Sequence, residues 1–159
     1  MPEGFQTIPD WFSFENQGAG VAITDFGDGQ QHLVVLMVDN PPQQNRGLYR
    51  IGHKLDGEGR ITGDWTPWVD VPDWFSWENQ GADIAVANLD GNGGRDLVVL
   101  MIDNPPQQNR GFYRIGKNLD ANGNVAQWTP WIEVPNWFSF ENQGGGTLIS
   151  VAVGLKKVR

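Results

Sequence analysis

The sequence contains no cysteine and only two histidines among its 159 residues. The lack of cysteine excludes a disulfide framework and thiol chemistry within this chain. No apolar run approaches the roughly 18 residues that a membrane-spanning helix needs, so we expect no membrane partner. Positive charge is also scarce, with 11 lysines and arginines against 19 acidic residues and a net charge of -8. A nucleic-acid-binding domain normally presents a basic patch, and we therefore expect no nucleic-acid partner.

The amino-terminal residues Met1–Gly4 lack the basic and apolar regions of a signal peptide, and none is expected in this chain. Glycine, proline and tryptophan are plentiful, with 21, 10 and 8 copies. This composition indicates a turn-rich all-β protein with aromatic packing.

A tandem repeat organises the whole chain. The motif Trp-Phe-Ser-aromatic-Glu-Asn-Gln-Gly begins at Trp11, Trp74 and Trp137, at intervals of 63 residues. Two further motifs occur twice each: Asp-Asn-Pro-Pro-Gln-Gln-Asn-Arg-Gly at 39–47 and 103–111, and Trp-Thr-Pro-Trp at 65–68 and 128–131. Such self-similarity is typical of repeat arrays and propellers. We interpret residues 1–159 as one repeat domain with units 10–72, 73–135 and a partial unit 136–159.

Each full unit is predicted to form a four-stranded antiparallel β-sheet. The expected strands are 21–26, 33–38, 48–54 and 68–71 in the first unit, and 84–89, 97–102, 112–117 and 131–134 in the second. The second strand of each unit is apolar without alternation, so it should be buried on both faces. Phe5–Ile8 matches a fourth strand, and Thr147–Val153 loosely matches a first strand. The prediction is therefore two full units plus one strand at each end.

Residues 84–100 combine a strand, a loop rich in Asp, Asn and Gly, and the run Asp-Leu-Val-Val, and Tyr-Arg-Ile-Gly follows at 113–116. This order resembles the FG-GAP/VCBS repeat, the blade of integrin-like β-propellers and of some propeller lectins. The Trp-rich remainder of each unit is not part of the FG-GAP/VCBS pattern. It implies propeller-type blades, a calcium-binding loop, and a secreted or cell-surface location.

Two units cannot form a closed propeller alone, since closed propellers have about four to eight blades. We therefore expect closure by oligomerisation, with copies of the chain as partners. The alternative architecture is a ten-stranded barrel with internal pseudo-two-fold symmetry. Small lectins with two repeats of similar length adopt such barrels.

One edge of each unit is the candidate binding site. Alternate loops of an antiparallel sheet share an edge, which brings the Trp-Phe-Ser loop and the Pro-Pro-Gln-Gln-Asn-Arg loop together. Residues 33–47 and 97–111 are identical at 14 of 15 positions, whereas the opposite loops, 26–32 and 89–96, differ in sequence and length. Duplication alone does not explain why only one edge stayed unchanged.

The candidate ligand-binding residues on this edge are tryptophans and polar side chains repeated in both units. They are Trp11, Glu15, Asn16, Gln17, Gln43, Gln44, Asn45 and Arg46, with Trp74, Glu78, Asn79, Gln80, Gln107, Gln108, Asn109 and Arg110. Amide and guanidinium groups can bind hydroxyl groups, and tryptophan offers an apolar surface to a sugar ring. The sequence thus favours a multivalent, lectin-like module that binds glycans at one site per repeat. The alternative is a non-catalytic, self-assembling structural scaffold or engineered propeller fragment, in which these residues only fix the loops and the packing between units.

Oxygen-bearing side chains alternate in one loop of the second unit, at Asn88, Asp90, Asn92 and Asp96. Hard oxygen ligands on a glycine-rich loop suit Ca²⁺, and the resembling family binds calcium with this loop. With two carboxylates the expected affinity is weak. In the first unit His32 stands where Asp96 does, so no metal is expected there. A plain Asn-Gly turn remains the alternative.

We expect no enzyme activity. The two histidines, His32 and His53, do not recur in the second unit, so the repeated Trp-Phe-Ser serines have no recurring base. Glu15 and Asp39, repeated as Glu78 and Asp103, could form the carboxylate pair of a glycosidase. A catalytic pair duplicated in every repeat would be unusual.

Overall fold

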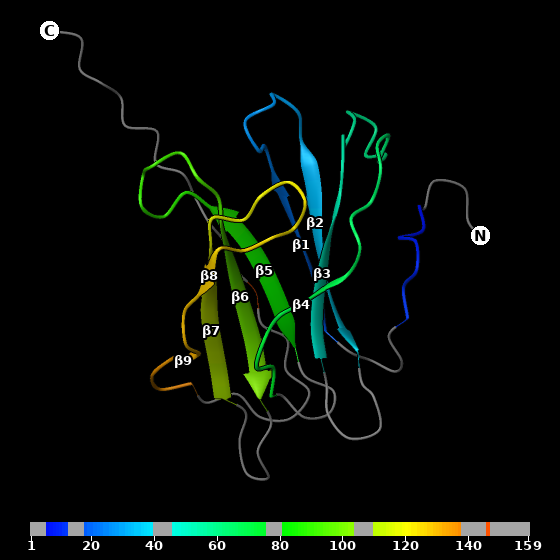
Figure 1. Ribbon diagram of the computed structural model, residues 1–159. Helices are drawn as coiled ribbons and strands as arrows, with labels where there is room; N and C mark the ends of the chain where they lie inside the picture. The colour runs from blue at the N-terminus through cyan, green and yellow to red at the C-terminus, as the bar shows by residue number, and fades with distance from the viewer. Residues whose placement is uncertain are drawn as a thin grey trace, which may run out of the picture.

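The computed structural model describes residues 6–12, 18–39, 46–75, 81–103, 110–137 and 146. In these residues the protein is all-β and contains no helix. The described residues therefore include no helix that could cross a membrane. Two antiparallel sheets stand side by side in Figure 1, one from each full unit. The prediction of an all-β protein built from sheet-forming repeats is confirmed.

The first sheet has the strand order of the sequence, and each strand pairs with the next. Its strands are β1 (Ala19–Thr24), β2 (His32–Asp39), β3 (Arg46–Gly52) and β4 (Val69–Asp70). The second sheet repeats this arrangement with β5 (Ala82–Ala87), β6 (Asp96–Asp103), β7 (Arg110–Lys117), β8 (Gln127–Trp128) and β9 (Ile132–Glu133), of which both β8 and β9 pair with β7.

The first three strands of each unit lie where the sequence placed them, within a few residues. The expected fourth strand is shorter, because only two residues on each side, in β4 and β9, keep ladder pairing. Residues 6–8 are not in a strand, which leaves this part of the expected amino-terminal strand unformed. Thr147–Val153 lies outside the described residues. β2 is buried almost throughout, as its unbroken apolar sequence predicts.

The two sheets stack front to back. Val34, Leu36 and Val38 of β2 share one hydrophobic cluster with Leu97, Val99 and Met101 of β6. By sequence, however, Val34 corresponds to Val98 and Leu97 to Leu33, because the equivalent positions are 64 residues apart. Successive side chains of a strand point to opposite faces. One face of the first sheet therefore packs against the opposite face of the second.

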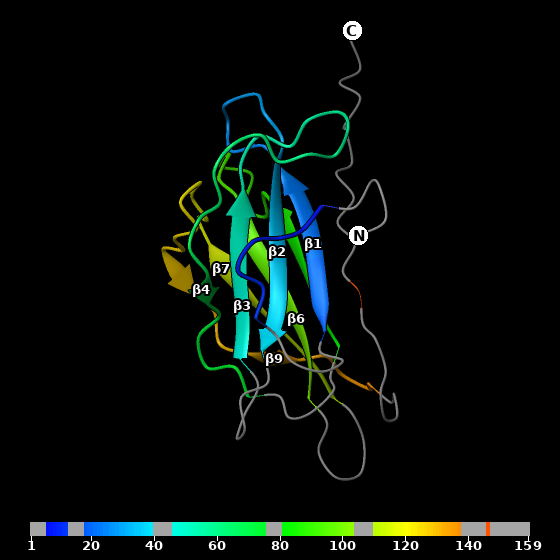
Figure 2. The ribbon, with the colours of Figure 1, turned by 90° about the vertical axis from the view of Figure 1, so that its right-hand side faces the viewer.

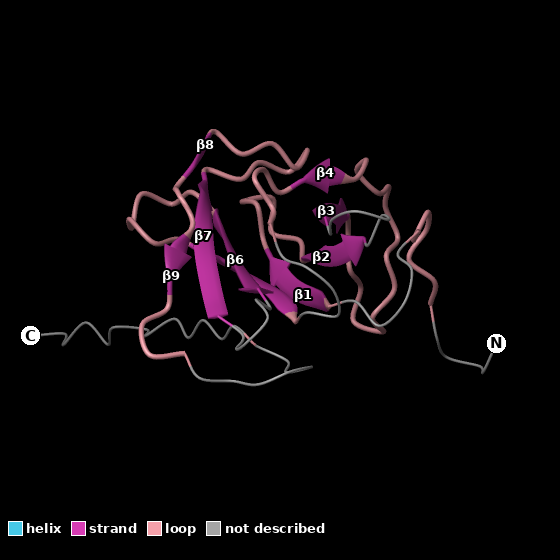
Figure 3. Ribbon diagram, turned by 90° about the horizontal axis from the view of Figure 1, so that it is seen from below, coloured by secondary structure: helices cyan, strands magenta, loops and turns pink. Residues whose placement is uncertain are grey.

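This stacking differs from a pseudo-two-fold barrel, which would bring equivalent faces together in one closed sheet. In the described part of the chain the strands form two separate sheets, seen one behind the other in Figure 2. Viewed from below in Figure 3, β1 lies between the other strands of its own sheet and those of the second sheet. Gly20 permits this approach, because a Cβ atom there would lie 2.8 Å from the Cα atom of Asp83 on β5.

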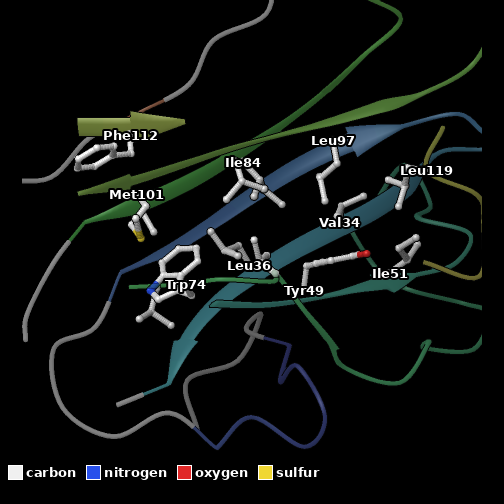
Figure 4. Close-up of a cluster of buried hydrophobic side chains, with 14 residues drawn as sticks. Val34, Leu36, Tyr49, Ile51, Trp74, Ile84, Leu97, Met101, Phe112 and Leu119 are labelled. Carbon is white, nitrogen blue, oxygen red and sulfur yellow. The ribbon is translucent and has the colours of Figure 1, made fainter. Parts of the chain in front are cut away.

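Tyr49 and Trp74 fill the space between the sheets (Figure 4). The Tyr49 hydroxyl donates a 2.6 Å hydrogen bond to the carbonyl of Gly123 in the second unit. Burial is the first cause that raises the pKa of Tyr49, with the charge of Asp120 adding to it, so the hydroxyl stays a donor. The core thus joins the two units with both apolar contacts and a buried hydrogen bond.

Candidate functional site

The candidate binding edge is anchored by the ends of the strands that flank its loops. Asp39, the last residue of β2, pairs with Arg46, the first residue of β3. The Val38 amide donates to the Gly18 carbonyl at 3.1 Å, which brings the entry to β1 to the same edge. The second unit repeats these contacts with the pair Asp103 and Arg110. The end of the Trp-Phe-Ser loop and both ends of the Pro-Pro-Gln-Gln-Asn-Arg loop therefore lie at one edge of each sheet.

Four of the predicted ligand-binding residues lie in the described part of the chain: Trp11, Arg46, Trp74 and Arg110. The remaining twelve lie outside the described residues: Glu15, Asn16, Gln17, Gln43, Gln44, Asn45, Glu78, Asn79, Gln80, Gln107, Gln108 and Asn109.

Each edge arginine is held by a buried aspartate. A terminal nitrogen of Arg46 lies 2.8 Å from Oδ2 of Asp39, and the same contact between Arg110 and Asp103 measures 3.1 Å. The side chains of both aspartates are only 7% exposed, whereas those of Arg46 and Arg110 are 48% and 40% exposed. One terminal nitrogen of each guanidinium is thus fixed by a buried carboxylate, and each arginine stays about half exposed. The other terminal nitrogen of Arg46 lies 4.0 Å from the exposed carboxylate of Asp70.

The second unit holds its arginine through a further aromatic contact. The Arg110 guanidinium lies 5.0 Å from the ring centre of Phe112, a cation–π distance. Oδ1 of Asp103 and Nε of Arg110 are buried and have no hydrogen-bond partner among the described residues. A buried polar atom without a partner costs free energy. The arginine is therefore oriented by charge and aromatic contact rather than by a complete hydrogen-bond network.

The two described tryptophans of the candidate site have different environments. Trp74 is 4% exposed, presses against Gly47 and makes an edge-to-face contact with Trp131 at 5.7 Å. Its ring packs between the units and offers no open face to a sugar. Trp11 is 39% exposed and lies edge-on to Trp68 at 5.9 Å. Among the described tryptophans of the predicted set, only Trp11 presents surface to a ligand.

A second repeated arginine, which sequence reasoning missed, binds the Pro-Asp segment that precedes its unit's Trp-Phe-Ser motif. Arg50 on β3 is 5% exposed and lies between Trp65 and Trp68, 5.3 Å and 5.1 Å from their ring centres. It donates to the carbonyls of Thr66 and Pro9. Arg114 repeats this arrangement with Trp128, Trp131 and the carbonyls of Thr129 and Pro72.

We call Arg50 or Arg114 together with its two flanking tryptophans the arginine clasp. Each clasp holds a Pro-Asp segment. Asp10 and Asp73 extend it, with carboxylates 3.7 Å and 3.6 Å from the guanidinium groups. Burial lowers the pKa of both arginines, and the aspartates oppose that shift. The repeated Tyr-Arg-Ile-Gly and Trp-Thr-Pro-Trp motifs were the signal in the sequence for this structure.

Protein donors bind the side-chain oxygens of three of the four predicted calcium-loop residues, Asp90, Asn92 and Asp96, whereas Asn88 is exposed. Asp96 is 2% exposed, and its carboxylate accepts from Lys117 at 3.3 Å and from the backbone amides of Leu89 and Asn118. Asp90 accepts from the side chain of Asn92 at 2.7 Å. No group of three or more acidic or histidine side chains placed for a metal occurs in the described residues. A cation bound at this loop would have to compete with Lys117 for the carboxylate of Asp96.

Comparisons with protein-family models, with curated proteins and with solved structures find no match to this chain.

Proposed function

We propose that the protein is a non-enzymatic, multivalent carbohydrate-binding module with one ligand site per repeat. The observation that carries this proposal is the repeated, half-exposed arginine at the same edge of each sheet. Arg46 and Arg110 are each fixed by a buried aspartate and remain about half exposed to solvent. A guanidinium carries five N–H donors and no acceptor, so the exposed part can donate to ligand hydroxyl groups.

The charge of the protein and the hydrogen-bonding groups near each edge arginine indicate the class of ligand. The protein carries a net charge of -8, and a buried aspartate accompanies each edge arginine. This balance disfavours a polyanionic ligand and favours a neutral one that can accept and donate hydrogen bonds. Neutral sugars meet that requirement. The polar Gln-Gln-Asn segments that precede both arginines in the sequence would supply further donors and acceptors.

Several weak sites on one assembly would strengthen binding to glycans that carry many copies of a sugar. We propose that the sheets are propeller-type blades and that copies of the chain assemble to close the propeller. The front-to-back stacking supports this, because such contacts leave a complementary face at each end of the pair. The resemblance to FG-GAP/VCBS repeats supports a secreted or cell-surface location, and calcium would at most add modestly to stability.

A structural scaffold without a ligand is the second candidate. The specific observation in its favour is that Asp39 and Arg46 are the final register pair of their hairpin. Their ion pair could serve only to fix the hairpin at this edge. The same holds for Asp103 and Arg110.

A glycan array probed with the intact protein tests the proposal directly. Binding to a defined subset of neutral glycans is the expected result, followed by calorimetry with the matching free sugar. The titration should give two sites per chain with affinities in the weak range typical of single sites. If no glycan on the array is bound while the protein is folded, the scaffold interpretation stands.

A further inference from the structure

The two units of the chain are joined by a segment that leaves one unit and is held by the next. Residues 72–74 follow β4 of the first unit, yet the Pro72 carbonyl accepts from Arg114 and the Asp73 carbonyl accepts from Trp131 at 2.9 Å. Trp74 turns back and packs on Gly47 of the first unit. The junction is therefore held by the clasp of the following unit, and its tryptophan packs on a glycine of the preceding unit.

The amino-terminal segment occupies the clasp of the first unit. The Pro9 carbonyl accepts from Arg50 at 2.6 Å, and the Asp10 carbonyl accepts from Trp68 at 3.0 Å. Asp10 and Asp73 adopt the same left-handed backbone conformation, with φ values of 53° and 55°. Residues 9–10 therefore stand where the end of a preceding unit would be.

The third copy of this segment, residues 135–137, makes the glycine contact, but no contact with a clasp occurs among the described residues. Trp137 packs on Gly111 as Trp74 does on Gly47, and Asn136 has the left-handed φ of 58°. Pro135 and Asn136 are nevertheless exposed, and neither accepts a hydrogen bond from another residue that the structure describes. The segment already has the conformation that a clasp holds, and no clasp surrounds it in the part of the chain that the structure describes.

The face of the second sheet beside this segment is also less covered than its counterpart. Val34, Tyr49 and Ile51 of the first sheet are at most 1% exposed, because the second sheet packs on them. Their equivalents Val98, Tyr113 and Ile115 are only partly buried. An apolar face of one repeat is thus incompletely covered at the point where the next repeat would stack.

From these observations we propose that a second copy of this chain docks on the second unit through the same contacts that join the two units within the chain. Residues 135–136 would enter the Arg50 clasp of the second copy, and the Tyr113 hydroxyl would donate to its Gly59 carbonyl, as Tyr49 does to Gly123. The inference rests on the assembly proposed above and does not depend on sugar binding. It commits to one partner because the first unit of every copy carries the matching surface.

Docking requires an exchange of segments. The Arg50 clasp of the incoming copy is filled by its own Pro9 and Asp10, and these must leave before residues 135–136 enter. The hydrogen bonds lost and gained are of the same kind, so the newly covered face of the second sheet drives the exchange. Asp10 adds a carboxylate 3.7 Å from Arg50, which Asn136 cannot supply. The chain therefore favours its own segment at low concentration and the exchanged form at high concentration.

Sedimentation velocity over a range of protein concentrations, on the full chain and its variants, tests the exchange. Asn136→Asp should strengthen self-association roughly twofold to fivefold, the range of an exposed ion pair, and Asp10→Asn should strengthen it similarly. Asn136→Val should weaken association about tenfold or more, because a β-branched residue resists a positive φ. Tyr113→Phe should weaken it roughly twofold to tenfold through loss of one hydrogen bond. Asp73→Asn, within the intact internal clasp, is the matched control and should leave association unchanged.

A folded wild-type protein that stays monomeric at every concentration would overturn the proposal. So would variants at positions 10, 113 and 136 that all associate like the wild type. Calorimetry with a monovalent sugar on the same samples separates the two proposals, because a single site does not require assembly. Sugar binding by a monomer would leave the binding function intact while removing the docking surface.

Discussion

The Nδ1 atoms of His32 and His53 lie 3.0 Å apart, at the positions that Asp96 and Lys117 occupy in the second unit. In the second unit these two positions form an ion pair, with Nζ of Lys117 3.3 Å from Oδ2 of Asp96. The first unit uses two imidazoles, of which one must donate and the other accept. Two protonated rings would both be donors, so this contact requires at least one neutral histidine.

We predict that this pair makes stability depend on pH near neutrality. Burial, and then the neighbouring His32, lower the pKa of His53 below its ordinary value of 6.5. As pH falls below that value, the unfolded chain takes up a proton before the folded one does. Stability is therefore full above about pH 6.5 and falls below it, by at most about 1.4 kcal/mol per pH unit for one group. Thermal melting between pH 5 and 8 measures this slope.

Two variants separate the histidine pair from general acid effects. His53→Gln removes the titrating group and should flatten the melting temperature between pH 5 and 7. Lys117→Gln breaks the equivalent ion pair of the second unit and leaves the buried Asp96 without its cation. It should lower the melting temperature over the whole range, with the slope unchanged. If the melting temperature of His53→Gln still falls between pH 7 and pH 5, another group titrates in this range.

The edge arginines should separate binding from folding when they are changed to lysine. Arg46→Lys with Arg110→Lys keeps a cation beside Asp39 and Asp103. The free energy of unfolding should therefore fall only by the cost of weaker pairing, about 1 kcal/mol. Sugar binding should fall roughly tenfold to hundredfold per site because the planar set of donors is lost. Calorimetry and melting on one sample measure both effects.

Changing the same arginines to alanine should have a different effect. Each buried aspartate would lose its counter-charge, so the double alanine variant should melt earlier than the double lysine variant. If both variants bind sugar as the wild type does, the arginines do not contact the ligand.

Gly47→Ala should strongly destabilise the protein. An added Cβ would lie 2.2 Å from the ring of Trp74, which is itself enclosed between the units. Overpacking of this kind costs about 1–3 kcal/mol, and chemical denaturation should show that loss. Gly57→Ala is the control, since nothing lies within 4 Å of its Cβ position and its φ is not in the left-handed region. Equal stability of the two variants would contradict the packing described for Trp74.

Calcium removal should have at most a slight effect on melting. Asp96 already interacts with Lys117 and two backbone amides, so little binding energy is left for an ion. Ligand binding stabilises a fold only in proportion to its affinity and concentration. Differential scanning calorimetry with chelator or with millimolar Ca²⁺ checks this. A large upward shift with Ca²⁺ would show that the loop rearranges to release Asp96.

The sequence by itself determined the repeat, the strand order and the buried second strand. These follow from local features: a 63-residue period, unbroken apolar runs and glycine-rich turns. It also placed Arg46 and Arg110 at one sheet edge, because antiparallel pairing forces alternate loops together. The length of the fourth strand was overestimated, since Pro72 and Pro135 restrict pairing while Trp74 and Trp137 turn back onto the sheet.

Only the tertiary structure decided the roles of individual side chains. Trp11 and Trp74 have the same local sequence, yet one is 39% and the other 4% exposed, because Trp74 has a unit on each side. Arg50 resembles any polar residue of a strand until two tryptophans and the Pro9 carbonyl surround it. Such contacts join residues about 40 positions apart. Their energy depends on stacking between sheets, which no local pattern in the chain specifies.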